Sequence, residues 1–468
     1  MAAVTAFLDL AVDVIWGPVM LVFLFGTGIF LTLGLRGITV SRIAYGFRAL
    51  WRGRTAEPGA VGQIAPFNAV SIALAAAIGT GNITGVATAI HLGGPGAVFW
   101  MWLTAVVGMA MNFAETVLAV HYREVDAVGN HVGGPMYYIR NGLGKNWTWL
   151  AMLFAFFGMV SAFGGGNAIQ AHSLAQVAGG YFGLPFWLTA SLLAALTLAV
   201  VSGGVRRLAR VAGILVPVMI VGYVVGALAI ILVHFDRLPG AFALIVGDAF
   251  TGSAAAGGFA GSTVMAAIHF GVARGIFSNE AGMGTMPIAH ATAQTRHPVR
   301  QGTIGMLGPF IDTLVVCTMT ALVIVMTGAW IDGQTGVPLA TAAFESGLPG
   351  FGQPIVVFGL LVFSFTTLLG WSFFGERLAE FLFGVRAITP YRVLWIVMIF
   401  VGALAQEQLD LLWLVATALN GLMAIPNLIG LLLLSPVVFR MTIDFFGEGE
   451  GDAPETPSTH GTEAPRPH

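Results

Sequence analysis

Long apolar runs divide this sequence, and each is close to the length that spans a lipid bilayer. A helix needs about 20 apolar residues to cross the hydrocarbon core, and that window selects eleven segments: roughly 12–35, 64–91, 97–121, 148–178, 185–203, 211–234, 260–291, 301–328, 354–382, 391–407 and 409–438. Only 9% of the residues are charged, whereas soluble domains carry about 25%. We therefore expect an all-α, polytopic membrane protein, embedded in a lipid bilayer and without a nucleic-acid partner.

Basic residues between the runs predict the orientation, because Lys and Arg favour cytoplasmic loops. Every second loop is basic, and these loops hold Arg36, Arg42, Arg48, Arg52 and Arg54; Arg123, Arg140 and Lys145; Arg206, Arg207 and Arg210; Arg296 and Arg300; and Arg386 and Arg392. The opposite loops hold Arg237 alone. We expect the N-terminus outside and the C-terminus in the cytoplasm, in the plasma (inner) membrane of a prokaryote. Residues 447–468 are polar and Pro-rich, and predict a disordered cytoplasmic tail.

Two similar heptads indicate an internal repeat. The sequence from Asn82 reads N-I-T-G-V-A-T, and that from Asn279 reads N-E-A-G-M-G-T, which is 279 − 82 = 197 residues further on. Each heptad interrupts an overlong span, and the second interrupted span comes five spans after the first, an odd number, so the two units cross the membrane in opposite directions. This pattern predicts the 5+5 inverted repeat with two broken helices that many secondary transporters share. The predicted units are an extra N-terminal helix with its basic loop (1–55), two five-helix repeats (56–237 and 238–446) and the tail.

The chemistry of such breaks favours a binding site. Free backbone groups at membrane depth are tolerated where they line a cavity. Unwinding around Gly79, Gly81 and Asn82 frees N–H groups that suit a carboxylate and carbonyls that suit an ammonium group or a small cation. Residues 275–282 offer the same groups from the other side. The alternative is that Gly81 and Gly85, four residues apart, only let helices pack closely. Residues 93–96 are expected to form an external turn.

Several motifs, spread over about residues 10 to 440, resemble the alanine or glycine:cation symporter family. They are GTGNI at 79–83, GGPGAVFWMWL at 93–103 with Gly108 and Met109, GGPMYYI at 133–139 and SNEAGMGT at 278–285. The resemblance implies a leucine-transporter-like fold and sodium-coupled uptake of small neutral amino acids. The tail has no counterpart in these motifs.

The breaks and this resemblance together give the candidate site residues. Expected substrate-binding residues are Thr80, Gly81, Asn82, Ile83, Asn167, Gln170, Ile276, Phe277, Ser278, Asn279 and Trp371. Expected sodium ligands are Ala77, Ile78, Gly81, Ser364, Thr366 and Thr367. Asn167 and Gln170 fit equally well as satisfied amides between helices. Phe277 and Trp371 either wall the substrate cavity, leaving room for a methyl side chain, or are plain core.

Ionisable residues inside the predicted spans are functional candidates by default. They are Glu115, Arg274, Glu280, Asp312 and Arg377. Arg377 lies between Glu376 and Glu380 near the end of a span, where a local ion pair is the simpler reading. Arg274 and Glu280 flank the second break, and the sequence does not assign their partners. His91 and His269 have no nearby ligand pattern, and Cys317, the single cysteine, reads as a buried structural thiol.

Three classes of function are compatible with a polytopic chain. The paired breaks favour a secondary active transporter that works by alternating access, and the resemblance implies that it carries alanine, glycine or D-alanine with Na⁺ as coupling ion. Proton coupling through Glu115, Glu280 or Asp312 is the alternative. A channel would need a continuous polar lining, and an enzyme a nucleophile–base pair or metal motif that the sequence does not contain. Substrate preference, ion stoichiometry and oligomeric state stay open.

Overall fold

The computed structural model describes residues 2–55, 59–251, 264–405 and 409–447. Its first half contains α1 (Ala2–Ile15), α2 (Pro18–Gly34), α3 (Ile38–Ser41), α4 (Ile43–Arg52), α5 (Pro66–Ala77), η1 (Thr80–Asn82), α6 (Thr84–Gly93), α7 (Gly96–His121), β1 (Glu124–Val125), β2 (His131–Val132), α8 (Pro135–Leu143), η2 (Lys145–Trp147), α9 (Thr148–Ser161), η3 (Ala162–Ala168), α10 (Ile169–Phe182), α11 (Phe186–Val201), α12 (Gly204–Val233) and η4 (Phe235–Arg237). Its second half contains α13 (Leu238–Thr251), α14 (Val264–Asn279), α15 (Met286–His290), α16 (Pro298–Gly305), α17 (Leu307–Pro309), η6 (Phe310–Cys317), α18 (Thr318–Thr327), η7 (Ala329–Asp332), α19 (Gly336–Gly347), α20 (Gly352–Phe383), η8 (Val385–Ala387), α21 (Ile388–Leu404) and α22 (Leu409–Gly447). Apart from Gly447, the predicted tail lies outside the described residues.

The helices confirm a multi-pass membrane protein. Eight helical stretches in the described part are long and apolar enough to cross a bilayer. The remaining predicted spans are α11, which has 16 residues, and the two interrupted pairs α5–α6 and α14–α15. On α12, Ile214, Val218, Val221 and Val225 form an exposed stripe at helical spacing. An exposed apolar stripe on a long helix is what contact with lipid tails requires.

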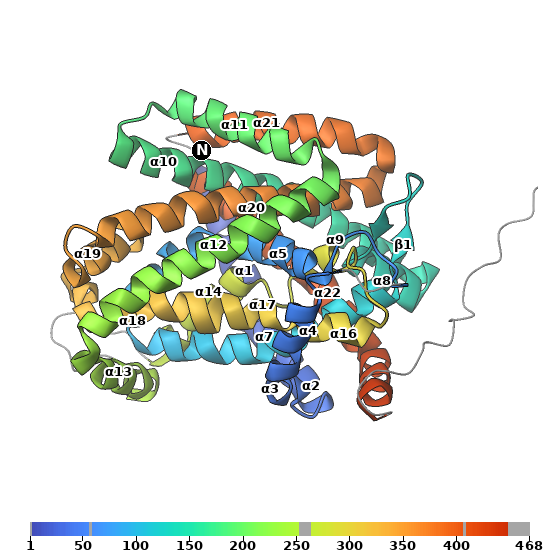
Figure 1. Ribbon diagram of the computed structural model, residues 1–468, viewed down its shortest axis with the longest axis horizontal. Coiled ribbons are helices and arrows are strands. Elements are labelled where there is room, and N and C mark those ends of the chain that lie inside the picture. Colours follow the sequence, from blue (N-terminus) through green and yellow to red (C-terminus); the bar gives the residue numbers. More distant parts are fainter. Residues whose placement is uncertain (1, 56–58, 252–263, 406–408, 448–468) are drawn as a thin grey trace, which may run out of the picture.

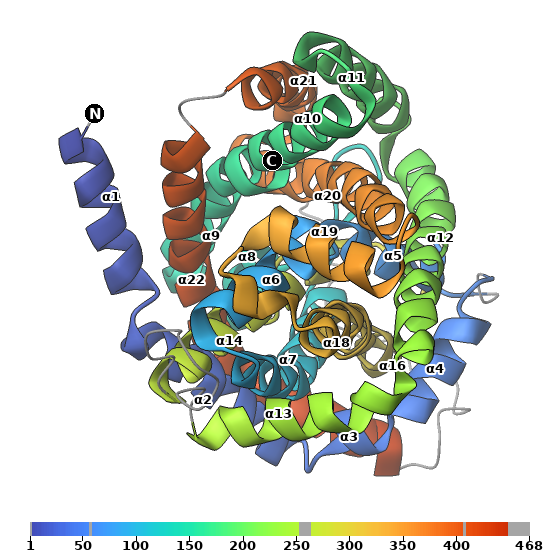
Figure 2. The ribbon, with the colours of Figure 1, turned by 90° about the vertical axis from the view of Figure 1, so that its left-hand side faces the viewer.

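The first predicted span is interrupted. Residues 12–35 were expected to form one helix, but α1 ends at Ile15 and α2 begins at Pro18. Pro18 has no backbone N–H and disfavours a helical conformation for Gly17, which is extended with φ −65° and ψ 178°. As a result α1 stands apart at the edge of the bundle and packs against α22 (Figure 2).

Two other segments differ from the expectation. The last helix continues beyond 438 to Gly447, because Phe445 and Phe446 pack against His297 and Tyr45. The loop after α7 contains a small antiparallel hairpin, which an all-α prediction missed. Its turn is set by the carboxylate of Asp126, which accepts hydrogen bonds from two backbone N–H groups of the same turn.

The helices form two packed groups with the breaks between them (Figures 1 and 2). In the first group, α7 packs against α14 and α16, and α6 packs against α14. In the second, α10 and α11 pack against α20 and α21, which lie together on one side of the bundle in Figure 2. α5 and α12 pack against each other and against α20. The first break therefore faces α20 of the second group.

Candidate functional site

The first break is a short extended segment followed by one turn of 3₁₀ helix. α5 ends at Ala77, Gly79 is extended at φ −134° and ψ −156°, and α6 begins at Thr84. The side chain of Asn82 stabilises this segment, because its Oδ1 accepts a hydrogen bond from the backbone N–H of Gly79 at 2.9 Å. Ideal Cβ geometry would place a side chain at Gly79 2.7 Å from Thr367 Oγ1. Glycine is therefore what lets the break approach α20 so closely.

The second break uses left-handed backbone instead. α14 ends at Asn279, and three of the next five residues have positive φ: Glu280 at 51°, Gly282 at 81° and Gly284 at 79°. A positive φ is uncommon for a residue with a long side chain and costs free energy. Asn279 Oδ1 accepts from the backbone N–H of Ala281 at 3.1 Å, so this asparagine also bonds the backbone of its own break.

Asp312 connects the two breaks. It lies in η6, a π-helical segment, and its side chain is fully buried. Its carboxylate accepts from Asn82 Nδ2 at 2.6 Å, from Ser278 Oγ at 2.8 Å and from its neighbour Thr313 at 2.8 Å. A buried carboxylate needs such donors to offset its lost hydration. Asn82 belongs to the first break and Ser278 precedes the second, so one carboxylate couples their positions.

Two further carboxylates hold the second break. Glu280 accepts from Trp371 Nε1 at 3.1 Å and from Thr285 Oγ1 at 2.6 Å. Glu115, on α7, accepts from Asn427 Nδ2 at 2.6 Å, and the same amide donates to the carbonyl of Gly282 at 2.8 Å. Tyr138 donates to Asn427 Oδ1. Side chains from α7, α8, α20 and α22 therefore fix this break in place.

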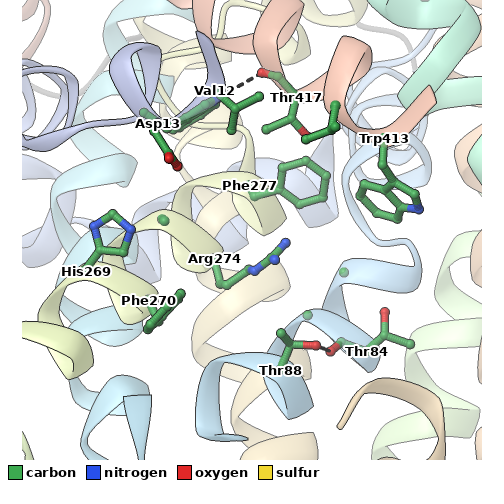
Figure 3. A pocket seen from close by; sticks show the side chains of 15 residues that line it. Val12, Asp13, Thr84, Thr88, His269, Phe270, Arg274, Phe277, Trp413 and Thr417 are labelled. Carbon is green, nitrogen blue, oxygen red and sulfur yellow. Dashed lines mark hydrogen bonds between the residues drawn. The ribbon is translucent and has the colours of Figure 1, made fainter. Parts of the chain in front are cut away.

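One cavity of about 520 Å³ reaches the first break (Figure 3). It lies between α1, α6, α14 and α22 and is lined by Val12, Asp13, Trp16, Gly81, Thr84, Gly85, Thr88, His269, Phe270, Ala273, Arg274, Phe277, Trp413, Leu414 and Thr417. Of the predicted substrate-binding residues, Gly81 and Phe277 line it. The rings of Phe277 and Trp413 lie 6.1 Å apart and form one aromatic wall.

The other predicted substrate residues of the two breaks lie behind this surface. Thr80, Asn82, Ile83, Ile276, Ser278 and Asn279 are all buried. Their polar groups are used within the protein: Asn82 and Ser278 bond Asp312, and the carbonyl of Ile276 accepts from the backbone of Glu280. The structure thus brings these residues to the breaks without exposing them to the cavity.

The predicted residues Trp371 of α20, Asn167 of η3 and Gln170 of α10 lie outside this cavity. The indole of Trp371 lies against the second break and donates to Glu280. Asn167 Nδ2 donates to the carbonyl of Trp395 on α21, and Gln170 Nε2 donates to the carbonyl of Gly165 in η3. Neither amide lines the cavity. Their side-chain oxygens, Asn167 Oδ1 and Gln170 Oε1, have no hydrogen-bond partner among the described residues.

Apart from Gly81, the predicted sodium ligands gather on one side of the first break, with one exception. Thr367 Oγ1 lies 3.1 Å from the carbonyl oxygen of Ile78, to which it donates. Ser364, three residues earlier on the same face of α20, is buried, and its hydroxyl has no partner within the described part of the chain. Ala77 ends α5 directly before Ile78.

Thr366 is the exception. Its hydroxyl lies against Met219 of α12 at 3.2 Å and donates to carbonyls of its own helix. A position one residue away from Thr367 is turned by about 100° around the helix, which carries it away from the break. Gly81 lies on the cavity side of the break rather than on the side of Thr367.

The predicted ion pair near the end of α20 is confirmed. Arg377 pairs with Glu376 and Glu380, each at 2.6 Å, and its guanidinium lies 3.7 Å from Asp126 of the hairpin turn. Arg392 of α21 also pairs with Glu376. This cluster joins the hairpin, α20 and α21 at the end of the bundle remote from the cavity.

Sequence reasoning missed part of the cavity. Asp13 and Trp16 come from the N-terminal segment, and Trp413 from the last helix. Each is an isolated residue in an apolar run, and no motif marks it. The one signal was the rule that an intramembrane charge is a functional candidate, which singled out Arg274 and applies equally to Asp13.

The chain is similar to known proteins over most of its length. The model of the sodium:alanine symporter family matches residues 1–458. The sodium/alanine symporter AgcS of Methanococcus maripaludis is 46% identical over 440 residues, covering 92% of this chain and 95% of the relative. The probable sodium/glutamine symporter GlnT of Bacillus subtilis is 39% identical over 443 residues, covering 93% and 89%. A crystal structure of the Eremococcus coleocola manganese transporter is similar with a TM-score of 0.50 and 14% identity, covering 81% of this chain and 78% of the other, which shows a shared fold alone.

Proposed function

The chain belongs to the sodium:alanine symporter family, a family of transporters rather than enzymes, and from this premise we propose that it carries a small neutral amino acid together with Na⁺ by alternating access. The observation that supports this most is the double use of the first break. One side of it contacts the hydroxyl of Thr367, with Ser364 one turn earlier on α20, and its other side lines the cavity at Gly81. An ion and an amino acid bound there share one segment of backbone.

We propose that Na⁺ binds between the first break and α20. Small hard cations prefer oxygen ligands, and this position offers the carbonyls of Ala77 and Ile78 with the hydroxyls of Thr367 and Ser364. The unpartnered hydroxyl of Ser364 supports the assignment, because a buried polar group without a partner costs about 1–3 kcal/mol and a bound cation removes that cost. Thr366 is left out of this set because it faces Met219.

The amino acid is proposed to bind at the floor of the cavity. Backbone N–H groups at the start of a helix favour a carboxylate, and the start of α6 meets the cavity at Thr84, next to Gly81. Phe277 and Trp413 then limit the side chain, which favours alanine or glycine over larger substrates. D-alanine fits the same size limit.

The architecture supports alternating access. We propose eleven spans, made of an extra N-terminal span and a 5+5 inverted repeat in which α5–α6 and α14–α15 are the equivalent broken helices. The group of α6, α7, α14 and α16 would rock against α10, α11, α20 and α21. The distribution of basic residues supports an orientation with the N-terminus outside and the C-terminus in the cytoplasm of a prokaryotic cell.

The energetics of coupling are sufficient. One Na⁺ moving inward gains about 2.3 kcal/mol per 100 mV of membrane potential and about 1.4 kcal/mol for each tenfold concentration gradient. The two contributions together concentrate a neutral solute more than about a hundredfold.

The test is uptake of labelled alanine into proteoliposomes, with glycine, D-alanine and glutamine as competitors. We expect uptake that depends on an inward sodium gradient and persists with a protonophore, together with counterflow exchange, which separates a carrier from a pore. Uptake that is unaffected when choline replaces sodium, and is abolished by the protonophore, would overturn sodium coupling. The buried carboxylates Glu115, Glu280 and Asp312 would then be the proton carriers to test.

A further inference from the structure

Arg274 is a cation that the proposed mechanism does not use. It lies on α14, one turn before Phe277, and Figure 3 shows its guanidinium pointing into the cavity between Phe277, Trp413 and Thr84. Its guanidinium carbon lies 6.0 Å from the ring centre of Phe277. Within residues 2–55, 59–251, 264–405 and 409–447, no carboxylate pairs with it, whereas the buried Arg377 pairs with two.

An acidic residue faces the same cavity from another element. Asp13 belongs to α1, the helix at the edge of the bundle, and Figure 3 shows its side chain on the opposite side of the cavity from Trp413. It forms no ion pair with the described residues. The cavity thus contains one cationic and one anionic side chain, neither of them in an ion pair among the described residues. Aromatic rings from Trp16, Phe270, Phe277 and Trp413 lie between and around them.

For Arg274, which lies inside a predicted span, an unpaired charge has a physical cost, whereas Asp13 is exposed. A charged side chain inside a membrane span is unfavourable and is normally retained beside a partner or a substrate path. The aromatic walls lower the local polarity, and charge–charge attraction is stronger where water is excluded. A ligand that carries one negative and one positive group satisfies both residues at once. A zwitterionic amino acid is the smallest common ligand with that pattern.

We propose that the cavity is a capture site for the incoming amino acid, in which Arg274 binds the carboxylate and Asp13 attracts the ammonium group before the ligand moves to Gly81. The inference rests on the proposed function, because the capture site is the entrance to the proposed substrate site at Gly81. It also assigns a role to α1, which lies outside the proposed ten-helix repeat. The substrate class it predicts is the net-neutral zwitterion, and a free carboxylate should compete for Arg274.

Stopped-flow tryptophan fluorescence tests the proposal, because Trp16 and Trp413 line the cavity. Purified protein in lipid nanodiscs is mixed with L-alanine in sodium buffer. Rim charges act mainly on association rates and their salt dependence. We expect Arg274→Gln to lower the association rate constant about tenfold and to abolish its salt dependence, with the dissociation rate constant changed less. Arg274→Lys should keep most of the rate, and Asp13→Asn should lower it by a smaller factor.

Two controls separate capture from a structural role. Arg237→Gln removes another basic residue, which lies in η4 outside the cavity, and should leave association unchanged. Propionate, a carboxylate without an amine, should slow alanine association in the wild type but not in Arg274→Gln.

Two results would contradict the proposal. The first is an unchanged association rate constant in Arg274→Gln. The second is an equal loss of thermal stability in Arg274→Gln and Asp13→Asn without any kinetic change, because this would indicate a structural ion pair between the two residues. If the wild type itself shows no sodium-dependent alanine signal, the proposed function fails rather than this inference alone.

Discussion

The two breaks begin from similar heptads, yet the protein builds them differently. The first break keeps negative φ throughout, lines the cavity at Gly81 and leaves backbone groups facing α20. The second break has three residues with positive φ and is buried from Glu280 to Thr285. The carboxylate of Glu280 accepts from Trp371 and Thr285, and the carbonyl of Gly282 accepts from Asn427.

This difference indicates that the two breaks have different roles. A backbone that borders a cavity has groups within reach of a ligand, whereas a backbone that is buried among side chains has none. We infer that the first break binds the substrates and that the second is a fixed joint from which Phe277 reaches the cavity. Asp312 transmits position between them, since it is bonded to both Asn82 and Ser278.

The largest expected effect is on the fold, at the second break. In Gly284→Val a branched side chain must adopt φ 79° and meets Asn427 Cγ at 2.9 Å. We expect a loss of about 3 kcal/mol of stability, seen as a lower thermal midpoint and little folded protein in detergent. Gly247→Val on α13 is the control, because a Cβ there meets nothing within 4 Å. Equal stability of the two variants would remove the distinction between the breaks.

The next largest effect is on binding, at the first break. A Cβ at Gly81 makes ordinary contact with Phe277 at 3.8 Å, so the fold accepts it, but the side chain occupies the proposed place of the carboxylate. Gly81→Val should raise the half-saturating alanine concentration in counterflow by at least about a hundredfold, and Gly81→Ala by less. Gly85→Ala, also in the cavity and free of contacts within 4 Å, is the matched control.

Substitutions on α20 distinguish the proposed sodium site from the proposed amino-acid site at the first break. Thr367→Val and Ser364→Ala each remove one proposed oxygen ligand, and we expect each to raise the sodium concentration needed for half-maximal uptake about tenfold. Thr366→Val changes the neighbouring hydroxyl, which faces Met219, and should leave sodium dependence near that of the wild type. A sodium effect of Thr366→Val as large as that of Thr367→Val would mean that the face of α20 is wrongly assigned.

The smallest effect concerns Trp371. Trp371→Phe keeps an aromatic ring but removes the donor to Glu280, which costs about 1 kcal/mol of stability. We expect a small decrease in the thermal midpoint and no change in the preference for alanine over leucine in a competition panel, because Trp371 lies behind the second break. Phe277→Ala, which widens the cavity itself, should admit the larger side chain. A change in the preference for alanine over leucine in Trp371→Phe alone would mean that Trp371 lines the substrate cavity.

The sequence predicted the fold well where hydrophobic length decides it. The spans, the positions of both breaks and the turn at Gly94, which has φ 70°, follow from apolar runs and from glycine. The interruption at Gly17 and Pro18 was missed although proline signals it, because the apolar run continues across it. The hairpin at Asp126 was missed because two-residue strands carry almost no periodicity.

The site was predicted less completely, for a physical reason. Similar heptads suggested equal breaks, but burial depends on which side chains reach them from elsewhere in the chain, such as Asn427 and Trp371. The direction of a side chain around α20 likewise separates Thr367 from Thr366 and is not visible in composition. Contacts between distant residues, such as Asp13 with the cavity, follow from packing alone.

Ligand-induced thermal stabilisation of purified wild type and Gly81→Val tests the central claim most directly, because it reports folding and binding in one experiment. A ligand that binds the folded state raises its thermal midpoint. We predict that alanine stabilises the wild type only when sodium is present, and that Gly81→Val has a wild-type midpoint without ligand and no shift with alanine and sodium. A full alanine shift in Gly81→Val would contradict the assignment of the substrate site to the first break.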